Sequence, residues 1–412
     1  MKQAKYNNES KQESISQTLV WQGHHYRLTR YPNQHRKELR AWDSADVYLL
    51  DTLIDLDIDL KHLGIIHDCF GALSTALANY DPIVYIDSWM SKHAIEDNLT
   101  QNQIHSDMTF ETKLEQLSAQ LSSSSIVIGK VPKQNSQLIA LLQVLRDALK
   151  PNTLLLLAGM DKHLSRSQYD LLAKYFGPSE FLPGVKKARI WKAYCQSRST
   201  AVQSESPQLT VKSLWGKEIA LPTYQLKLGA LPQVFSRDKL DLGSRFFLEH
   251  FAQLPKKRRV TDLACGYGVL GLVYLRLHPA TALTFCDESF QAIDSTLHNI
   301  ALNMPEKQTQ VTVYADDGLK QMPALSQELI ICNPPFHQQH TVSTDIAHSL
   351  FTDAYRALEA GGELWVVANR HLNYHIALKK RFTHCTTVAS NKKFVILKAV
   401  KSPNLLISNH LV

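Results

Sequence analysis

The stretch "RRVTDLACGYGVLGLVYL", residues 258–275, predicts a β-strand, a tight turn and an α-helix in immediate succession. Gly266, Gly268 and Gly271 spell G-x-G-x-x-G in this turn, and Asp287 follows about twenty residues later. This spacing is typical of α/β nucleotide-binding domains, in which a ligand lies against the turn at the helix N-terminus. The ligand itself stays open at this point, because any tight strand-to-helix turn needs small residues.

A second stretch, "ELIICNPPFHQQH" at residues 328–340, runs from a short apolar strand directly into Asn-Pro-Pro-Phe. The two prolines remove two backbone donors and fix two φ angles. They would therefore hold Asn333 and Phe336 rigidly at the end of a strand. Ligands of open parallel sheets bind at the carboxyl ends of the strands, where this motif and the glycine turn would meet.

The residue types favour a ligand other than a nicotinamide dinucleotide. Asp262 stands four residues before Gly266, in the pattern D-x-A-C-G-x-G. A carboxylate there suits a positively charged ligand, such as one with a sulfonium and an α-ammonium, and is unfavourable beside a pyrophosphate. Dehydrogenases also have no need of Asn-Pro-Pro-Phe.

Together these motifs resemble class I S-adenosylmethionine-dependent methyltransferases. Residues 262–268 match that family's E/D-x-G-x-G-x-G turn, with Ala264 in place of the first glycine. The resemblance implies S-adenosyl-L-methionine as cofactor, with its methionine end held by Asp262 and the backbone of Gly266 and Gly268. Asp287 would accept hydrogen bonds from the ribose hydroxyls. Asp316 or Asp317, in "YADDG", would contact the adenine, although a turn or helix cap is an alternative role for them.

The Asn-Pro-Pro-Phe motif is similar to the N/D-P-P-Y/F signature of enzymes that methylate planar exocyclic or amide nitrogens. Such a nitrogen is a poor nucleophile because its lone pair is delocalised. The resemblance implies a catalytic set in which Asn333 and the Pro334 carbonyl accept the two N–H bonds, Pro335 stiffens the turn, and Phe336 stacks on the base. Proximity and desolvation would then do most of the work, because the methyl group is already activated on sulfur.

The two halves of the chain carry the same order of elements, which predicts an internal duplication. "HDCFGALSTAL", "IVYIDSW" and "IVIGKVPK" in the first half parallel "DLACGYGVLGL", "LTFCDES" and "LIICNPPF" in the second. The separation of Asp87 and Lys130 nearly equals that of Asp287 and Asn333. Lys130 takes the place of Asn333, so the first half has lost the chemistry. We expect an α/β fold of two tandem Rossmann-like methyltransferase domains: a degenerate domain at 1–195 for structure or RNA recognition, a polar linker at 196–215, and a catalytic domain at 216–412.

A narrower resemblance spans nearly the whole chain. "VFSRDKLDLGSRFFLEH" (residues 234–250), the glycine turn and "NPPFHQQH" are similar to ribosomal RNA guanine-N2 methyltransferases, which have duplicated domains of which only the second binds cofactor. The large-subunit members are closer than the small-subunit members, which typically show Gly-Val-Phe-Ser where Gln233 precedes Val234 here. The resemblance implies methylation of a guanine N2 amine in 23S ribosomal RNA, with Phe235, Ser236 and Asp241 in a segment that closes over the site.

The target base would have to leave the helical stack to be reached. Two basic runs could hold its phosphates, although exposed basic runs are common. The first precedes the glycine-turn strand and the second ends the N-terminal half: Lys256, Lys257, Arg258 and Arg259, and then Lys186 and Lys187 with Arg189 and Lys192.

Composition limits the remaining alternatives. A net charge of +7 over 412 residues is only mildly basic, and no apolar run is long enough to span a membrane. The six cysteines are scattered, so a metal site is not expected, and we predict a cytoplasmic protein whose partner is ribosomal RNA and which could be a monomer. The alternatives are a 16S ribosomal RNA guanine-N2, an adenine-N6 or a protein glutamine methyltransferase, or a non-enzymatic RNA-binding assembly factor.

Overall fold

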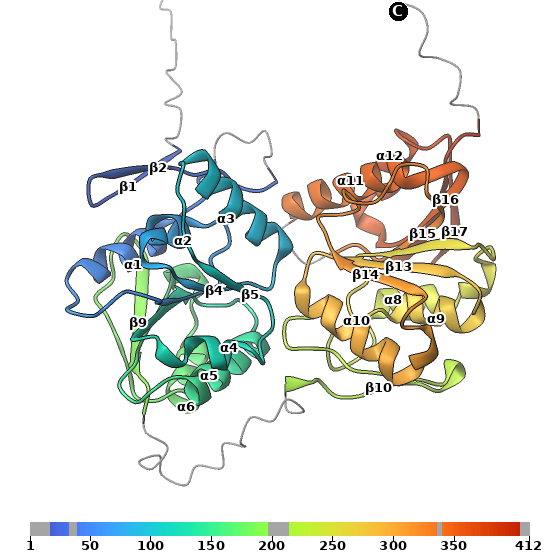
Figure 1. Cartoon of the computed structure of the whole chain (residues 1–412). Coiled ribbons are helices and arrows are strands. Elements are labelled where there is room, and N and C mark those ends of the chain that lie inside the picture. The colour runs from blue at the N-terminus through green and yellow to red at the C-terminus, as the bar shows by residue number, and fades with distance from the viewer. Residues whose placement is uncertain (1–16, 33–38, 197–213, 336–339, 404–412) are drawn as a thin grey trace, which may run out of the picture.

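The computed structural model describes residues 17–32, 39–196, 214–335 and 340–403, and it forms two α/β domains that lie side by side (Figure 1). Each domain contains one seven-stranded sheet, and the two sheets have the same strand order, element by element. This confirms the predicted fold class of two tandem Rossmann-like domains. Most of the predicted linker falls in residues 197–213, outside the described residues.

The N-terminal sheet has the order β5-β4-β3-β6-β7-β9-β8. Its strands are β3 (Gly64–Ile66), β4 (Ile83–Tyr85), β5 (Thr109–Glu111), β6 (Ile126–Lys130), β7 (Leu154–Met160), β8 (Ser179–Phe181) and β9 (Ala188–Tyr194). The first five are parallel, and β9 runs antiparallel to both β7 and β8. One face is covered by α1 (Ser44–Ile54), α2 (Ala72–Ala76) and α3 (Trp89–Gln101), the other by α4 (Leu117–Gln120), α5 (Asn135–Ala148) and α6 (Arg166–Tyr175).

The C-terminal sheet has the order β14-β13-β12-β15-β16-β18-β17. Its strands are β12 (Arg259–Leu263), β13 (Ala282–Asp287), β14 (Val311–Ala315), β15 (Gln327–Cys332), β16 (Leu358–Asn369), β17 (His384–Ser390) and β18 (Phe394–Val400). One face is covered by α8 (Leu242–Leu248), α9 (Val269–Leu277) and α10 (Phe290–Asn303), the other by α11 (His340–Ala357) and α12 (Tyr374–Lys379). The central parallel strands are buried on both faces, which is why they read as continuous apolar runs in the sequence.

Two small hairpins complete the fold. The first pairs β1 (Thr18–Trp21) with β2 (His24–Arg27), and the second pairs β10 (Ile219–Leu221) with β11 (Leu226–Leu228). Within the described ranges, no helix has both the length and the apolar character to cross a membrane.

The domains meet through the loops that follow β4 and β13. The backbone nitrogen of Trp89 donates to the carbonyl of Glu288 at 2.8 Å, and that of Phe290 donates to the carbonyl of Asp87 at 2.7 Å. Ser88 and Ser289 form an antiparallel β-bridge between these two pairs. One apolar cluster also continues from the α4–α6 side of the first sheet to the α8–α10 side of the second. The carboxyl ends of two corresponding strands are thus joined across the domain boundary.

Candidate active site

The glycine turn joins β12 to α9 in a conformation that favours glycine. Gly266 has a φ of 58° and Gly268 a φ of 81°, both in the left-handed region. A Cβ on Gly268 would also lie 3.0 Å from Cγ2 of Thr296, which is tighter than ordinary packing. Ala264 has a φ of 59° as well, so alanine occupies a position at which the backbone favours glycine. The turn keeps its shape, at a cost in conformational strain.

Two carboxylates fix the turn from either side. Asp262, only 1% exposed at the end of β12, accepts a 2.7 Å hydrogen bond from the backbone nitrogen of Gly271 through Oδ2. Burial raises the pKa of Asp262 to about 7. Asp287, the last residue of β13, accepts from the backbone nitrogens of Gly266 at 2.8 Å and Ser289 at 3.1 Å. Both carboxylates therefore lie at the carboxyl edge of the sheet, on adjacent strands.

Asp316 and Asp317 follow β14 and differ in their surroundings. Asp316 is 1% exposed and accepts a 2.9 Å hydrogen bond from the backbone nitrogen of Gln321 through Oδ2. Asp317 pairs with Lys320, whose ammonium neutralises its carboxylate. Because Asp317 is already paired, Asp316 is the better placed of the two to take a further donor.

Asn333 follows β15 and is oriented by two side chains from α8. Its Nδ2 donates to Oδ2 of Asp241 at 3.1 Å and to Oγ of Ser244 at 2.9 Å. The Asp241 carboxylate caps the same helix by accepting from the backbone nitrogen of Ser244 at 3.0 Å. Since a carboxylate is only an acceptor, the amide nitrogen of Asn333 must face it and the amide oxygen must point the other way. Pro334 is buried and Pro335 exposed, whereas Phe336 lies outside the described residues.

Three oxygen atoms at this edge are buried and accept no hydrogen bond from any residue in the described ranges. They are Oδ1 of Asp262, Oδ1 of Asp316 and Oδ1 of Asn333. A buried acceptor without a donor costs free energy, so each of these atoms calls for a partner, which can be a ligand or a water molecule. The three atoms come from the ends of β12, β14 and β15, which lie in the parallel part of a single sheet. They form a ready-made set of acceptors for a ligand that carries several N–H or O–H donors.

Sequence reasoning missed Ser244 and the contact that Asp241 makes. The pattern Asp-Leu-Gly-Ser at residues 241–244 predicts a helix N-cap, and the structure has this cap. The cap faces Asn333 because of the way α8 packs against the sheet, and the local sequence does not encode this packing. Phe235 lies in the same segment and is 48% exposed.

The N-terminal domain places other residues at the equivalent positions. The strand registers align Ile65 with Asp262 and Ile86 with Asp287, so both turn carboxylates are replaced by buried isoleucines. The equivalent of Asp287 is therefore Ile86 and not Asp87, which the spacing of the sequence had suggested. Gly71 keeps the 81° φ of Gly268 at the start of the helix.

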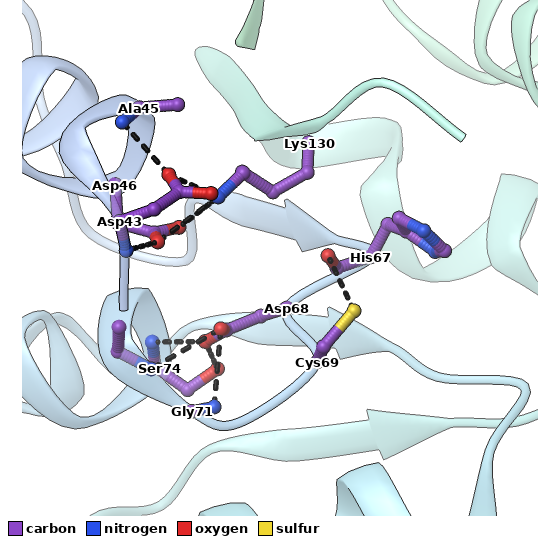
Figure 2. A network of polar contacts seen from close by, with 10 residues as sticks. Asp43, Ala45, Asp46, His67, Asp68, Cys69, Gly71, Ser74 and Lys130 are labelled. Atoms are coloured by element: carbon purple, nitrogen blue, oxygen red, sulfur yellow. Dashed lines mark hydrogen bonds and ion pairs between the residues drawn. The ribbon is translucent and has the colours of Figure 1, made fainter. Parts of the chain in front are cut away.

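An ion-paired cluster occupies the place of Asn333 in this domain (Figure 2). The Lys130 ammonium lies 2.8 Å from Oδ1 of Asp43 and 2.9 Å from Oδ1 of Asp46. Asp43 and Asp46 are the N-cap and third residue of α1, as Asp241 and Ser244 are of α8. The nearby Asp68 accepts from the backbone nitrogens of Gly71, Ala72 and Ser74, and so closes the first turn of α2. The acceptors of this site are already satisfied from within the domain.

The two predicted RNA-binding runs are not brought to the site. The first run lies at the start of β12, at the opposite end of the parallel strands from Asn333; it consists of Lys256, Lys257, Arg258 and Arg259. There, Arg259 pairs with Glu359 at 2.6 Å, and Glu328 accepts from the backbone of Arg258 and Arg259. Lys186 and Lys187 are exposed in the loop between β8 and β9 of the N-terminal domain. Either run could contact RNA only at a distance from the target base.

The fold, the glycine turn and the rigid Asn-Pro-Pro segment define a class I methyltransferase with a tandem, partly degenerate architecture. Family models agree: residues 225–398 match the Methyltransferase small domain, and residues 16–198 match the RLMG N-terminal domain.

The chain belongs to the family of ribosomal RNA large subunit methyltransferase G. It is 37% identical to the member from Aeromonas salmonicida over 92% of this chain and 98% of that protein. It is 35% identical to the member from Yersinia enterocolitica over 92% of each chain. Among solved structures, it resembles the 16S rRNA N2 methyltransferase RsmC of T. thermophilus, determined with AdoMet and guanosine. That match has a TM-score of 0.71 at 19% identity and covers 93% of this chain and 97% of the other, which shows a shared fold.

Proposed function

We propose that this protein transfers the methyl group of S-adenosyl-L-methionine to the exocyclic N2 amine of a guanine in 23S ribosomal RNA. Family membership supports the ribosomal RNA substrate and the large subunit. The observation that carries the chemistry is the buried, unpaired Oδ1 of Asn333, whose amide is oriented by Asp241 and Ser244. Such a substrate would place the protein in the cytoplasm with the ribosome.

The residues at the carboxyl edge fit the cofactor. Oδ1 of Asp262 would accept from the α-ammonium, and the Gly266 and Gly268 backbone would lie along the methionine part. The Asp287 carboxylate would bind the ribose hydroxyls, and Oδ1 of Asp316 would accept from the adenine amine. The bound cofactor supplies a methyl group on a sulfonium, which needs no further activation.

Asn333 would act on the nucleophile. Its Oδ1 and the carbonyl of Pro334 would each accept one N–H of the guanine amine, which draws the lone pair out of conjugation and towards the methyl carbon. The guanine N2 would then take the methyl group that the sulfonium supplies, and the proton that N2 loses would pass to water. No side chain at this edge needs to be a strong base. Phe336 would stack on the base and keep it in line.

The N-terminal half would have no catalytic centre of its own. We assign residues 1–195 to a degenerate domain, 196–215 to a linker and 216–412 to the catalytic domain. Ile65 and Ile86 support this division, because neither can replace the carboxylate found at the equivalent position of the second domain. Lys130 supports it as well, since its ammonium accepts no hydrogen bond from an amine.

The decisive experiment has two parts. The first is mass spectrometry of ribosomal RNA from cells with and without the protein, in which N2-methylguanine at one 23S position should disappear. Loss of the methyl group from a 16S guanine or from an N6-methyladenine would replace the proposed substrate. So would loss of a methylated glutamine, measured by mass spectrometry of protein from the same cells. If no methyl group were lost and the purified protein transferred none, the chain would be a non-enzymatic RNA-binding factor.

The second part tests the site with purified protein and single-turnover methyl transfer at saturating RNA. Asn333→Ala should lower the rate by about ten- to a hundredfold, the effect of losing one hydrogen bond made in the transition state. Its cofactor and RNA dissociation constants should stay within about twofold of wild type, because the bond is not part of ground-state binding. Asn135→Ala, at an exposed residue at the start of α5, is the matched control and should transfer at the wild-type rate.

A further inference from the structure

A cavity of about 450 Å³ opens at the carboxyl end of β7 in the N-terminal domain. It lies between the residues that follow β7, the first turn of α6 and the hairpin formed by β8 and β9. It is separate from both the catalytic edge and the Lys130 cluster. Its lining combines aromatic rings with arginines, and this combination carries a prediction about what it binds.

One wall of the cavity is an aromatic ring with an accessible face. Phe181 is 38% exposed, although it has contacts with two neighbouring side chains. Its other side stacks on Tyr169, with ring centroids 3.9 Å apart and planes 19° from parallel. The guanidinium of Arg189 lies 5.5 Å from the Phe181 centroid. The ring is therefore held rigidly while part of its surface remains open to a planar ligand.

The floor of the cavity is a buried tryptophan. Trp191 lines the cavity and is 1% exposed, and its indole Nε1 donates to no atom of the described residues. A buried indole N–H normally finds an acceptor. Its ring packs edge-on against Tyr169 at 5.6 Å, so packing holds it in place without a hydrogen bond. Trp191 is therefore a fixed, buried floor of the cavity.

The rim of the cavity is positively charged. Arg166 and Arg189 line it, and each pairs with one aspartate, Asp170 and Asp161 respectively. Both ion pairs are solvent-exposed and therefore weak. Each arginine could exchange its carboxylate partner for an RNA phosphate at little cost in free energy. Three further lysines stand on the adjoining loops, are exposed, and have no acidic partner in the described part of the chain: Lys162, Lys186 and Lys187. The excess of cations at the rim favours an anionic ligand.

We propose that this cavity binds one unpaired nucleotide of the RNA substrate, outside the target guanine. The base stacks on the exposed part of Phe181, and its flanking phosphates lie against Arg166 and the lysines of the β8–β9 loop. Stacking platforms beside basic residues are how proteins bind single-stranded RNA. The proposal rests on the proposed function for the identity of the RNA. It gives the domain that lost its chemistry a role in selecting the substrate.

The position of the cavity suits this role. It follows β7 at the carboxyl edge of the first sheet, and the same edge meets the catalytic domain through β4. An RNA segment whose target base enters the catalytic site can therefore continue along this edge. Because the loops after β4 and β13 lock the domains together, the two RNA-binding positions would act at a fixed separation.

The test measures binding of the full-length protein to a fluorescent, deproteinised fragment of 23S ribosomal RNA and to short single-stranded oligonucleotides. Phe181→Ala should weaken both by about five- to a hundredfold, the range measured for loss of one stacked base. Phe181→Tyr should keep wild-type affinity because it preserves the stacking face. Tyr194→Ala is the matched control, since Tyr194 is 45% exposed on the same hairpin but does not line the cavity.

A second measurement separates stacking from charge. The double variant with Lys186→Ala and Lys187→Ala should reduce the slope of log affinity against log salt by roughly 0.7 for each phosphate that the protein no longer neutralises. Phe181→Ala should leave that slope unchanged. Its cofactor affinity and its transfer rate at saturating RNA should also match wild type, which shows that the variant is folded and that the cavity is not part of the catalytic centre.

Several outcomes would overturn the proposal. Wild-type affinity of Phe181→Ala for RNA would do so, as would an equal loss in Tyr194→Ala. Normal binding to deproteinised RNA with weakened binding to ribosomal particles would assign the cavity to a ribosomal protein instead. Because RNA binding is measured without methyl transfer, the result is independent of the proposed reaction: the cavity could bind RNA even if the guanine assignment failed.

Discussion

Asp87 of the N-terminal domain caps the first turn of α10 in the C-terminal domain, accepting a 2.7 Å hydrogen bond from the backbone nitrogen of Gln291. It also accepts a 2.7 Å bond from Oγ of Ser289. The arrangement is reciprocal, because Glu288 accepts a 2.6 Å bond from Oγ of Ser88. These loops are equivalent in the duplication, and the second one begins with Asp287. The N-terminal domain thus helps to position the loop of the C-terminal domain to which we assign the ribose contact.

Asp87→Ala should therefore weaken cofactor binding, although Asp87 lies in the other domain. Loss of the cap and of the Ser289 bond should lower the free energy of unfolding by about 1–3 kcal/mol. The cofactor dissociation constant should rise several-fold as the Asp287 loop loosens. Calorimetry with thermal denaturation measures both effects. Asp97→Ala, at an exposed position of α3, should change neither, and unchanged cofactor affinity in Asp87→Ala would show that the two loops are not coupled.

Cofactor affinity should depend on pH through Asp262. Burial raises the pKa of Asp262 to about 7, so in the free protein its carboxyl is protonated below that pH. Binding a cationic α-ammonium favours the ionised form. The affinity should therefore be highest above pH 7 and should fall by at most about tenfold per unit as pH drops below it. Titration calorimetry from pH 5.5 to 8 measures this slope.

The control for this pH dependence is Glu288→Gln. Burial also raises the pKa of Glu288 to about 7, but its carboxylate bonds to Ser88 of the other domain. This variant should keep the pH dependence of cofactor affinity, whereas Asp262→Asn should bind weakly and lose the dependence. A slope that survives in Asp262→Asn would mean that another group causes it.

Ala264→Gly should stabilise the protein. Ala264 has a φ of 59°, where an L-residue with a side chain is strained by about 1–2 kcal/mol. Glycine relieves this strain but gains freedom in the unfolded chain, so the net gain should be about 1 kcal/mol. Denaturant unfolding measures it, with cofactor affinity unchanged. Ala301→Gly, at an exposed position of α10, should instead destabilise by about 0.5–1 kcal/mol, and a loss in both variants would contradict the strain argument.

The Lys130 cluster should be structural and not a second cofactor site. Lys130→Met leaves Asp46 buried, 5% exposed, without its counterion, which should cost about 3–5 kcal/mol. The double variant Lys130→Asn with Asp46→Ser recreates the amide–hydroxyl pair of Asn333 and Ser244, and it should recover most of that loss.

Cofactor binding provides the second readout for this cluster. In both variants the stoichiometry of cofactor should remain one per chain, because Ile65 and Ile86 still occupy the places of the two turn carboxylates. A second equivalent bound by the double variant would show that Lys130 alone had closed the site.

The sequence by itself determined the fold class, the duplication, the glycine turn and the rigid Asn-Pro-Pro segment. These follow from local patterns: apolar strand runs, turn residues and fixed proline φ angles act over a few residues and are readable without a structure. The comparisons confirm the fold and the family that these patterns predicted. The cofactor and catalytic roles of the individual residues stay predictions.

Only the tertiary structure decided which polar groups are satisfied and which are left open. Asn333 is oriented by Asp241, 92 residues away, and Ser88 binds Glu288 across 200 residues. The strand register shows that the equivalent of Asp287 is Ile86 and not Asp87. The direction of β12 puts residues 256–259 at the opposite end of the strands from the site. Such contacts depend on the order of the strands in the sheet and on the packing of the helices against it. Many weak interactions between residues far apart in the sequence decide both, so no short stretch of sequence specifies these contacts.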